Sequence, residues 1–275
     1  MQKEEFLKRI ETELKITKSS EHTIKTYIKF NRSLLDFCKK QPEDIQEQDV
    51  KNFLAENLSN KAASSNMVAL AAVRYAFSTI LKRDPSADIK RPKREKTIPT
   101  VLTKEEITNL IQSAGSRKSR LIISLLYGTG MRVSELTNLK TVDLSFDEKI
   151  GYIRKAKGKK DRLFNIPNHL LNSLRKIAEQ AKEERKEHLF PGPKGKLSER
   201  NIQKIVKKAA KKAGINKSVH CHTLRHSFAT HLLEQGENIR KIQELLGHEN
   251  LSTTEIYTHI STEHLKKVKS PLDNL

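Results

Sequence analysis

Two stretches near the C-terminus hold the side chains best suited to chemistry. In HTLRH, His222 and Arg225 stand three positions apart, so on a helix they share one face. In LLGHENLSTTEIYTHI, His248 follows a glycine, and Tyr257 falls in the second turn of an expected short helix that begins near residue 252. A tyrosine hydroxyl, with a pKa of about 10, becomes a nucleophile at neutral pH only when a base or a positive field helps remove its proton.

Three further candidates lie upstream, beside glycine turns. Arg132 follows GTG and is expected in the first turn of a helix, with Glu135 one turn later. Lys157 directly precedes a glycine at the tip of an expected hairpin. Guanidinium groups can donate paired hydrogen bonds to phosphoryl oxygens as negative charge builds on them. A lysine can donate the proton that a departing 5′-oxygen needs. Singly, each residue type has a commoner structural use, but together the set indicates metal-free attack on a phosphodiester.

A zinc site made of His220, Cys221, His222 and His226 is the alternative chemistry for this stretch, since histidines four positions apart can bind a metal from one helix face. The stretch HTLRH lacks the glutamate of the metalloprotease pattern, however. The two cysteines, Cys38 and Cys221, stand singly, without the spacing of a structural zinc site or a disulfide framework. The sequence therefore favours chemistry without a metal or another cofactor.

The composition points to a polyanionic partner. Lys and Arg number 53 against 33 Asp and Glu, a formal charge of +20. Residues 91–275 hold 37 of these basic and 20 of these acidic residues, whereas residues 1–90 hold 16 and 13. The positive field therefore belongs mainly to the later part of the chain, where the reactive side chains also stand. Charge alone leaves open a lysine-rich surface that merely keeps the protein in solution.

The N-terminal sequence carries no recognisable targeting signal. MQKEEFLKRI has no apolar signal core, and no stretch approaches the roughly 18 uninterrupted apolar residues of a membrane span. We therefore expect a cytoplasmic protein with reduced thiols.

Residues 1–90 are expected to form four amphipathic helices, because apolar residues recur three and four positions apart. The expected buried positions are Phe6, Leu7, Ile10 and Leu14; Ile24, Tyr27, Ile28, Leu34 and Leu35; Val50, Phe53, Leu54 and Leu58; and Val68, Ala71, Ala72 and Tyr75. A basic linker over residues 91–102 follows, where Pro92 and Pro99 prevent a continuous helix. This segment could be a plain solvated linker or a strap that lies along phosphates.

The remainder, residues 103–275, is expected to be mainly helical with one β-hairpin. Thr103 and Glu106 form a capping-box pattern ahead of an apolar run, and RLIISLLYGTG predicts a buried helix that ends at its glycines. β-Branched and aromatic residues alternate with other residues on both sides of a glycine turn, which predicts a hairpin over 149–166. Further helices are expected over about 167–187, 198–213, 220–236 and 238–247.

Four motifs, TGMRVSEL, KAKGKKDRL, HTLRHSFATHLL and LLGHENLSTTEIYTHI, resemble the successive boxes of the tyrosine recombinase (phage integrase) family. They are closest to its Xer branch, and the helices before the linker are similar to the family's core-binding domain. The resemblance implies a mainly α fold with a small β-hairpin or sheet. It implies an N-terminal four-helix, SAM-like core-binding domain over 1–90 that binds DNA, the basic linker over 91–102, and an α+β catalytic domain over 103–275.

The same resemblance gives the reactive side chains their roles. The implied catalytic residues are Arg132, Lys157, His222, Arg225, His248 and the nucleophile Tyr257, with Glu135 in support. The family cuts and rejoins DNA through a 3′-phosphotyrosyl link, which stores the bond energy, so that neither ATP nor a metal is needed. A homotetramer on two double-stranded target sites is implied, with an accessory or second recombinase as a further partner.

The expected role is chromosome-dimer resolution, a step of chromosome partition at cell division. Integrases of mobile elements are the nearest alternative, but many carry an extra arm-binding domain, for which this chain is too short. Type IB topoisomerases share the chemistry. A sequence-specific DNA-binding protein without catalysis belongs to a different class, and the charge and the helix-turn-helix-like stretches near 222–246 would also suit it. Such a protein has no reason to keep all six reactive side chains.

Overall fold

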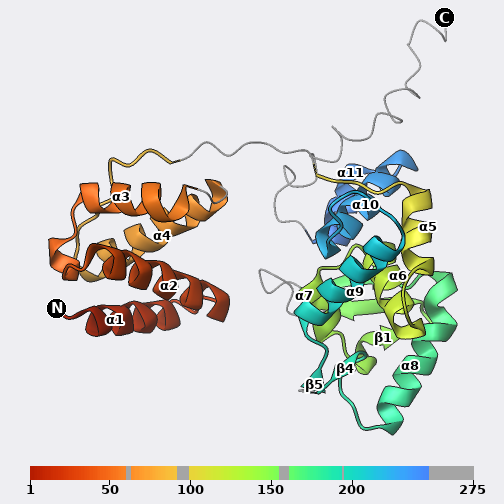
Figure 1. The fold of residues 1–275 in the computed structure, drawn as a ribbon. Coiled ribbons are helices and arrows are strands. Elements are labelled where there is room, and N and C mark those ends of the chain that lie inside the picture. Colours follow the sequence, from red (N-terminus) through yellow and green to blue (C-terminus); the bar gives the residue numbers. More distant parts are fainter. Residues whose placement is uncertain (60–62, 92–98, 155–160, 194, 248–275) are drawn as a thin grey trace, which may run out of the picture. The chain divides into compact units, whose positions relative to one another are not determined.

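A computed structural model of the protein describes residues 1–59, 63–91, 99–154, 161–193 and 195–247. The chain divides into two compact units, Met1–Lys96 and Thr97–Leu275, which are described separately below (Figure 1). Within the described ranges, no helix combines the length and the apolarity needed to cross a membrane.

The first unit is a bundle of four α-helices with a short 3-10 turn between the second and third. These elements are α1 (Lys3–Ile16), α2 (Glu21–Cys38), η1 (Pro42–Asp44), α3 (Glu47–Leu58) and α4 (Ala63–Ile80). Helix α2 begins where the Ser20 hydroxyl accepts a hydrogen bond from the Thr23 amide over 3.1 Å, and it packs against the other three helices. The rings of Phe6 and Phe77 meet edge to face at the centre of the core, 5.1 Å apart. The expected four-helix bundle is confirmed.

The buried face of α4 differs from the expected one. The buried residues of this helix are Ala69, Leu70, Ala72, Val73, Ala76 and Phe77. Val68 and Ala71, which the spacing favoured, are exposed instead. Because apolar residues lie on more than one side of α4, two neighbouring stripes fit the helical period, and packing against the other three helices selects between them.

The second unit is mainly helical with two small antiparallel sheets, as expected for the fold class. Its elements are α5 (Lys104–Gln112), α6 (Arg117–Thr129), α7 (Val133–Asn138), η2 (Thr141–Asp143), β1 (Leu144–Ser145), β2 (Ile150–Ile153), β3 (Arg162–Asn165), η3 (Asn168–Leu170), α8 (Leu171–Glu183), β4 (Pro191–Gly192), β5 (Gly195–Lys196), α9 (Glu199–Lys212), α10 (Cys221–Glu234) and α11 (Ile239–Leu246). Helix α6 is almost wholly apolar along its middle and packs against α5, α9 and α10 (Figure 1). It therefore forms the centre of this unit's core.

The predicted hairpin is present as β2 and β3, and β1 adds a short third strand in the order β1-β2-β3. Gly151 lies opposite Phe164, and a Cβ atom at Gly151 would lie 2.2 Å from the phenyl ring. A glycine is therefore required at position 151, because the buried Phe164 ring occupies the space that a side chain there would fill. At the far end of the pair, Ile153 lies opposite Arg162.

Helices α10 and α11 form a small apolar cluster of their own, made of Ala229, Leu233, Ile242 and Leu246. Helix α11 begins at the Asn238 cap and ends at Gly247, the bounds that the sequence predicts. Gly247 adopts a left-handed backbone with φ of 63°, which stops the helix directly before position 248.

Candidate active site

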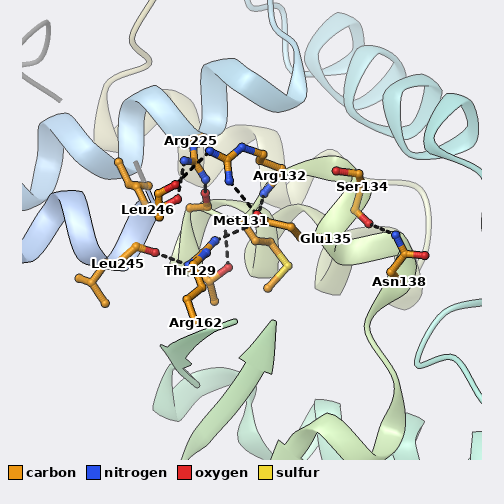
Figure 2. Close-up of polar contacts among 12 residues, drawn as sticks. Thr129, Met131, Arg132, Ser134, Glu135, Asn138, Arg162, Arg225, Leu245 and Leu246 are labelled. Atoms are coloured by element: carbon orange, nitrogen blue, oxygen red, sulfur yellow. Dashed lines mark hydrogen bonds and ion pairs between the residues drawn. The ribbon is translucent and has the colours of Figure 1, made fainter. Parts of the chain in front are cut away.

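Three arginines and one glutamate from distant parts of the sequence meet in the second unit (Figure 2). Arg132 and Glu135 come from the start of α7, Arg162 from β3, and Arg225 from α10. We call these four residues the arginine cluster. All four side chains are at least largely buried, although Arg132 keeps 20% of its side chain exposed.

Arg132 stands at the N-cap of α7, one position before the helix, rather than in its first turn as the sequence indicated. Its backbone is extended, with φ of −72° and ψ of 153°. The reason is the Glu135 carboxylate, which accepts one hydrogen bond from the Arg132 amide and one from its guanidinium group, each over 2.8 Å. The glutamate therefore starts the helix and orients the arginine side chain at once.

Glu135 is 7% exposed and is also bonded to Arg162, whose Nη2 donates to Oε2 over 2.8 Å. Burial alone would raise the pKa of the Glu135 carboxyl. The charge of Arg162, together with hydrogen bonds from Arg132 and Arg162, outweighs burial and holds the pKa below its usual range. The carboxylate is therefore ionised at neutral pH, and the cluster keeps a net positive charge.

Arg225 is 3% exposed and lies across the ends of two helices. Its Nη1 donates to the carbonyl oxygen of Gly130, the C-cap of α6, and its Nη2 to that of Leu246, each over 2.7 Å. Gly130 has φ of 60°, and a Cβ atom there would lie 2.4 Å from the Phe228 ring. A glycine is therefore needed for α6 to end this close to α10.

The carbonyl end of α11 is shared among the three arginines. Arg162 Nη1 donates to the Leu245 carbonyl, Arg225 Nη2 to the Leu246 carbonyl, and Arg132 Nη2 makes a longer contact of 3.4 Å with the Gly247 carbonyl. Figure 2 shows Arg162 bonded at Leu245 and Arg225 bonded at Leu246. Carbonyls at a helix C-terminus carry partial negative charge, so three successive oxygens balance part of the positive charge of the cluster.

His222 lies on α10 one turn before Arg225, and its ring is exposed. Partial desolvation, then the positive charges of Arg225 and Arg132, lower the pKa of the His222 imidazole. The ring is therefore neutral at pH 7 and has a nitrogen free to accept a proton. Its neighbour His226 has a ring centroid 6.5 Å away. Among the described residues, no group of three or more His, Cys, Asp or Glu side chains is arranged to hold a metal ion.

The structure thus brings together four of the side chains that the sequence singled out: Arg132, Glu135, His222 and Arg225. The other three, Lys157, His248 and Tyr257, lie outside the described residues. Sequence analysis missed Arg162. The signal was available, since Arg162 shares a strand face with the buried residues Phe164 and Ile166, and a charge on an inward face calls for a partner.

The arginine cluster is suited to bind an anionic group whose negative charge increases in a transition state. Its guanidinium groups are held in fixed directions by a carboxylate and by backbone carbonyls, so they need no reorganisation when negative charge develops beside them. A neutral imidazole next to them can accept a proton. The arrangement is therefore chemically competent to stabilise a phosphoryl group under nucleophilic attack.

Comparisons with known protein families and structures agree with this chemistry. Residues 100–264 match the phage integrase family, and residues 6–86 match the phage integrase N-terminal SAM-like domain. Tyrosine recombinase XerA of Thermococcus kodakarensis is 39% identical over 271 residues, which cover 96% of this chain and 94% of the relative. A crystal structure of XerA recombinase is 33% identical, with a TM-score of 0.57 and 97% of each chain covered. XerH site-specific recombinase bound to difH substrate, in a pre-cleavage complex, is 26% identical, with a TM-score of 0.73 over 91% of this chain and 79% of that one.

Proposed function

Because this chain belongs to the phage integrase family and is a Xer-type tyrosine recombinase, we propose that it cuts and rejoins DNA through a 3′-phosphotyrosyl intermediate on Tyr257. In the first step, the Tyr257 oxygen bonds to a DNA phosphorus while the bond from that phosphorus to the 5′-oxygen breaks. In the second step, a 5′-hydroxyl from the partner strand attacks the same phosphorus and releases the tyrosine. Each step exchanges one P–O bond for another, so no nucleotide hydrolysis is required.

Arg132 and Arg225 are the residues that stabilise the charge of the pentacoordinate phosphorus. Their guanidinium groups are held in the arginine cluster, with a net positive charge left over after Glu135 is paired. This surplus of fixed positive charge beside the exposed imidazole of His222 is the observation that carries the proposal.

The protons move through the remaining catalytic residues. His222, neutral because its pKa is lowered, accepts the proton of the Tyr257 hydroxyl or hydrogen-bonds a phosphoryl oxygen as charge builds. Lys157 donates the proton that the departing 5′-oxygen takes, and His248 supplies a further hydrogen bond to the phosphate.

Double-stranded DNA is the substrate, and each unit of the chain contributes to its binding. Residues 1–90 act as the core-binding domain, 91–102 as the linker, and 103–275 as the catalytic domain. On α9, exposed basic side chains recur along one face for the length of the helix: Arg200, Lys204, Lys207, Lys208, Lys211 and Lys212. A face of this kind meets the phosphate backbone, which dominates affinity for DNA. Four copies of the chain act together on two sites.

The biological role we propose is the resolution of chromosome dimers, in the cytoplasm, at cell division. The similarity to XerA and XerH relatives over most of the chain favours this role over the integration of a mobile element.

The test uses a nicked duplex that carries the sequence selected by the full-length protein from a random DNA library. The nick lets the short 5′-hydroxyl strand diffuse away, so that a covalent product accumulates. We expect a protein–DNA adduct that survives heat and SDS, that forms with wild type and with the control variant Tyr152→Phe, and that is absent in Tyr257→Phe. Binding by wild type without any adduct would overturn the proposed chemistry and support a DNA-binding protein without catalysis.

A further inference from the structure

Arg162 is a buried arginine that the catalytic roles above do not use. Only 8% of its side chain is exposed. Its guanidinium group joins two elements, because Nη2 donates to Glu135 Oε2 over 2.8 Å and Nη1 donates to the Leu245 carbonyl. Arg162 therefore connects the start of α7 with the end of α11, and it does so from strand β3 (Figure 2).

The bond to Glu135 bears on the direction of the first catalytic arginine. Glu135 Oε2 accepts from both the Arg132 amide and Arg162 Nη2, which leaves Oε1 to the Arg132 guanidinium group. With two donors fixing Oε2, the carboxylate plane cannot rotate, and Oε1 presents a single direction to Arg132. Removing Arg162 would free the carboxylate to rotate and would loosen that guanidinium group.

The bond to Leu245 bears on the other side of the site. The Leu245 carbonyl is followed by the Leu246 carbonyl that holds Arg225, so fixing one peptide fixes the next. The contact is close, since a Cβ atom at Gly247 would lie 2.8 Å from Arg162 Cδ. The end of α11 thus rests on the Arg162 side chain, and position 248 follows directly.

Stability alone does not account for an arginine at this position. Glu135 already has Arg132 as its partner, and a second buried guanidinium group adds positive charge that the carboxylate does not balance. Its Nε is buried without a hydrogen-bond partner among the described residues, which is a further cost. Replacement of a whole buried group of paired charges by apolar side chains of similar volume commonly gives equal or better stability, so stability does not require the charged group to which Arg162 belongs.

We propose that Arg162 is a positioning residue of the recombination reaction, which fixes the Glu135 carboxylate relative to the carbonyl end of α11. The two catalytic arginines bonded to these groups are thereby aimed at the scissile phosphate. Arg162 itself touches no substrate. This inference rests on the proposed function, because it assigns Arg162 to the same phosphoryl transfer.

The test compares full-length Arg162→Gln and Arg162→Lys with wild type on the nicked duplex. Arg154→Gln is the matched control, because Arg154 follows β2 in the same hairpin region but is 59% exposed, and its contacts are an ion pair with Asp143 and the face of the Tyr152 ring. We expect Arg162→Gln to slow single-turnover adduct formation by about 100-fold while the Kd for DNA changes by less than about threefold. Arg162→Lys keeps the charge but cannot donate to Glu135 and Leu245 at once through a planar guanidinium group, so we expect the rate of adduct formation to fall about 10-fold. Arg154→Gln should match wild type in rate.

The split between rate and affinity decides the outcome, because a purely structural defect lowers both together. Arg162→Gln with a wild-type rate would overturn the inference, as would a parallel loss of binding and rate in both variants. If thermal unfolding shows that Arg162→Gln does not fold, the same comparison of adduct rate with DNA affinity is made on Arg162→Lys alone. Absence of an adduct from wild type itself would instead refute the proposed function.

Discussion

The backbone amide and the guanidinium group of Arg132 donate to different oxygens of the Glu135 carboxylate, each over 2.8 Å. One buried carboxylate therefore starts α7 and directs the arginine side chain. The two residues differ in exposure, at 20% for the Arg132 side chain and 4% for that of Glu135. The positive charge stays accessible while the negative charge that orients it is withdrawn from solvent, which is what a site for an anionic substrate needs.

Replacement of the Glu135 carboxylate is expected to destabilise the protein strongly. Glu135→Gln keeps the shape but leaves Arg132 and Arg162 buried without their counter-charge, so we expect a loss of about 3 to 5 kcal/mol in the free energy of unfolding. Urea denaturation followed by circular dichroism measures it. The control is Glu187→Gln, whose carboxylate pairs with Lys140 at the surface and whose loss should leave the unfolding free energy unchanged within error. Equal effects of the two substitutions would contradict the role assigned to Glu135.

The close approach of α6 to α10 and α11 predicts a different sensitivity at Gly130. Gly130→Ala forces a left-handed alanine and places a methyl group 2.4 Å from Phe228 and 2.8 Å from Leu246. Gly214→Ala is the matched control, since its φ of 66° imposes the same strain while nothing lies within 4 Å.

We expect Gly214→Ala to cost about 1 to 2 kcal/mol of unfolding free energy from backbone strain. Gly130→Ala should cost that amount plus about 1 to 3 kcal/mol from the forced displacement of its neighbours. Denaturant unfolding of both variants measures the difference. Indistinguishable values would mean that the Phe228 and Leu246 side chains move aside at no cost.

Local signals in the sequence were sufficient for some helix ends but not for others, since α8 begins at Leu171 and not near residue 167, and Arg132 precedes α7. Thr103 and Glu106 form the predicted capping box, with hydrogen bonds of 3.1 and 2.7 Å, and α11 runs from its Asn238 cap to Gly247. Such signals work because a cap satisfies donors and acceptors within a few residues of itself. The family resemblance found in four motifs is likewise confirmed by matches that span most of the chain.

Features that depend on distant parts of the chain were harder to predict. The strand pattern marks Arg162 as inward-facing, but its partner Leu245 is 83 positions away and cannot be inferred from local sequence. The buried face of α4 could not be selected from sequence because apolar residues lie on more than one side of the helix. The catalytic roles of all the site residues remain predictions, and Lys157, His248 and Tyr257 also lie outside the part of the chain that the structure describes.

Another long-range contact fixes the start of the second unit's core. Leu102, which is fully buried, donates its backbone amide to the Ser227 hydroxyl on α10 over 2.9 Å. Ser227→Ala leaves that buried amide without an acceptor, so we expect a loss of about 1 to 3 kcal/mol in unfolding free energy. Thr230→Val is the control on the same helix, because the Thr230 hydroxyl is buried with no partner among the described residues. It should be neutral or stabilising by the same denaturation measurement, and a Ser227→Ala variant as stable as Thr230→Val would contradict the proposed contribution of Leu102.

The histidines of α10 predict how the protein responds to acid. Burial, then the charges of His222 and Arg225, lowers the pKa of His226 from 6.5 to about 4. The unfolded chain therefore binds a proton at this residue near pH 6.5, whereas the native protein binds it only near pH 4. Stability rises with pH wherever the unfolded state holds more protons, so the native state loses stability as the pH falls from about 7 to 4.

His226→Gln should remove part of this pH dependence. A shift of this size corresponds to at most about 3.5 kcal/mol, since one pKa unit is worth about 1.4 kcal/mol. Unfolding free energies of wild type and His226→Gln, measured in urea at pH 7, 6, 5 and 4.5, should have different slopes, with wild type losing more stability toward low pH because only its unfolded chain binds a proton at residue 226. His169→Gln, at an exposed position in η3, is expected to follow wild type throughout. Some slope should persist in His226→Gln, because burial also lowers the pKa of His222 and of His231. Parallel curves for wild type and His226→Gln across this range would show that His226 titrates alike in the folded and unfolded chains.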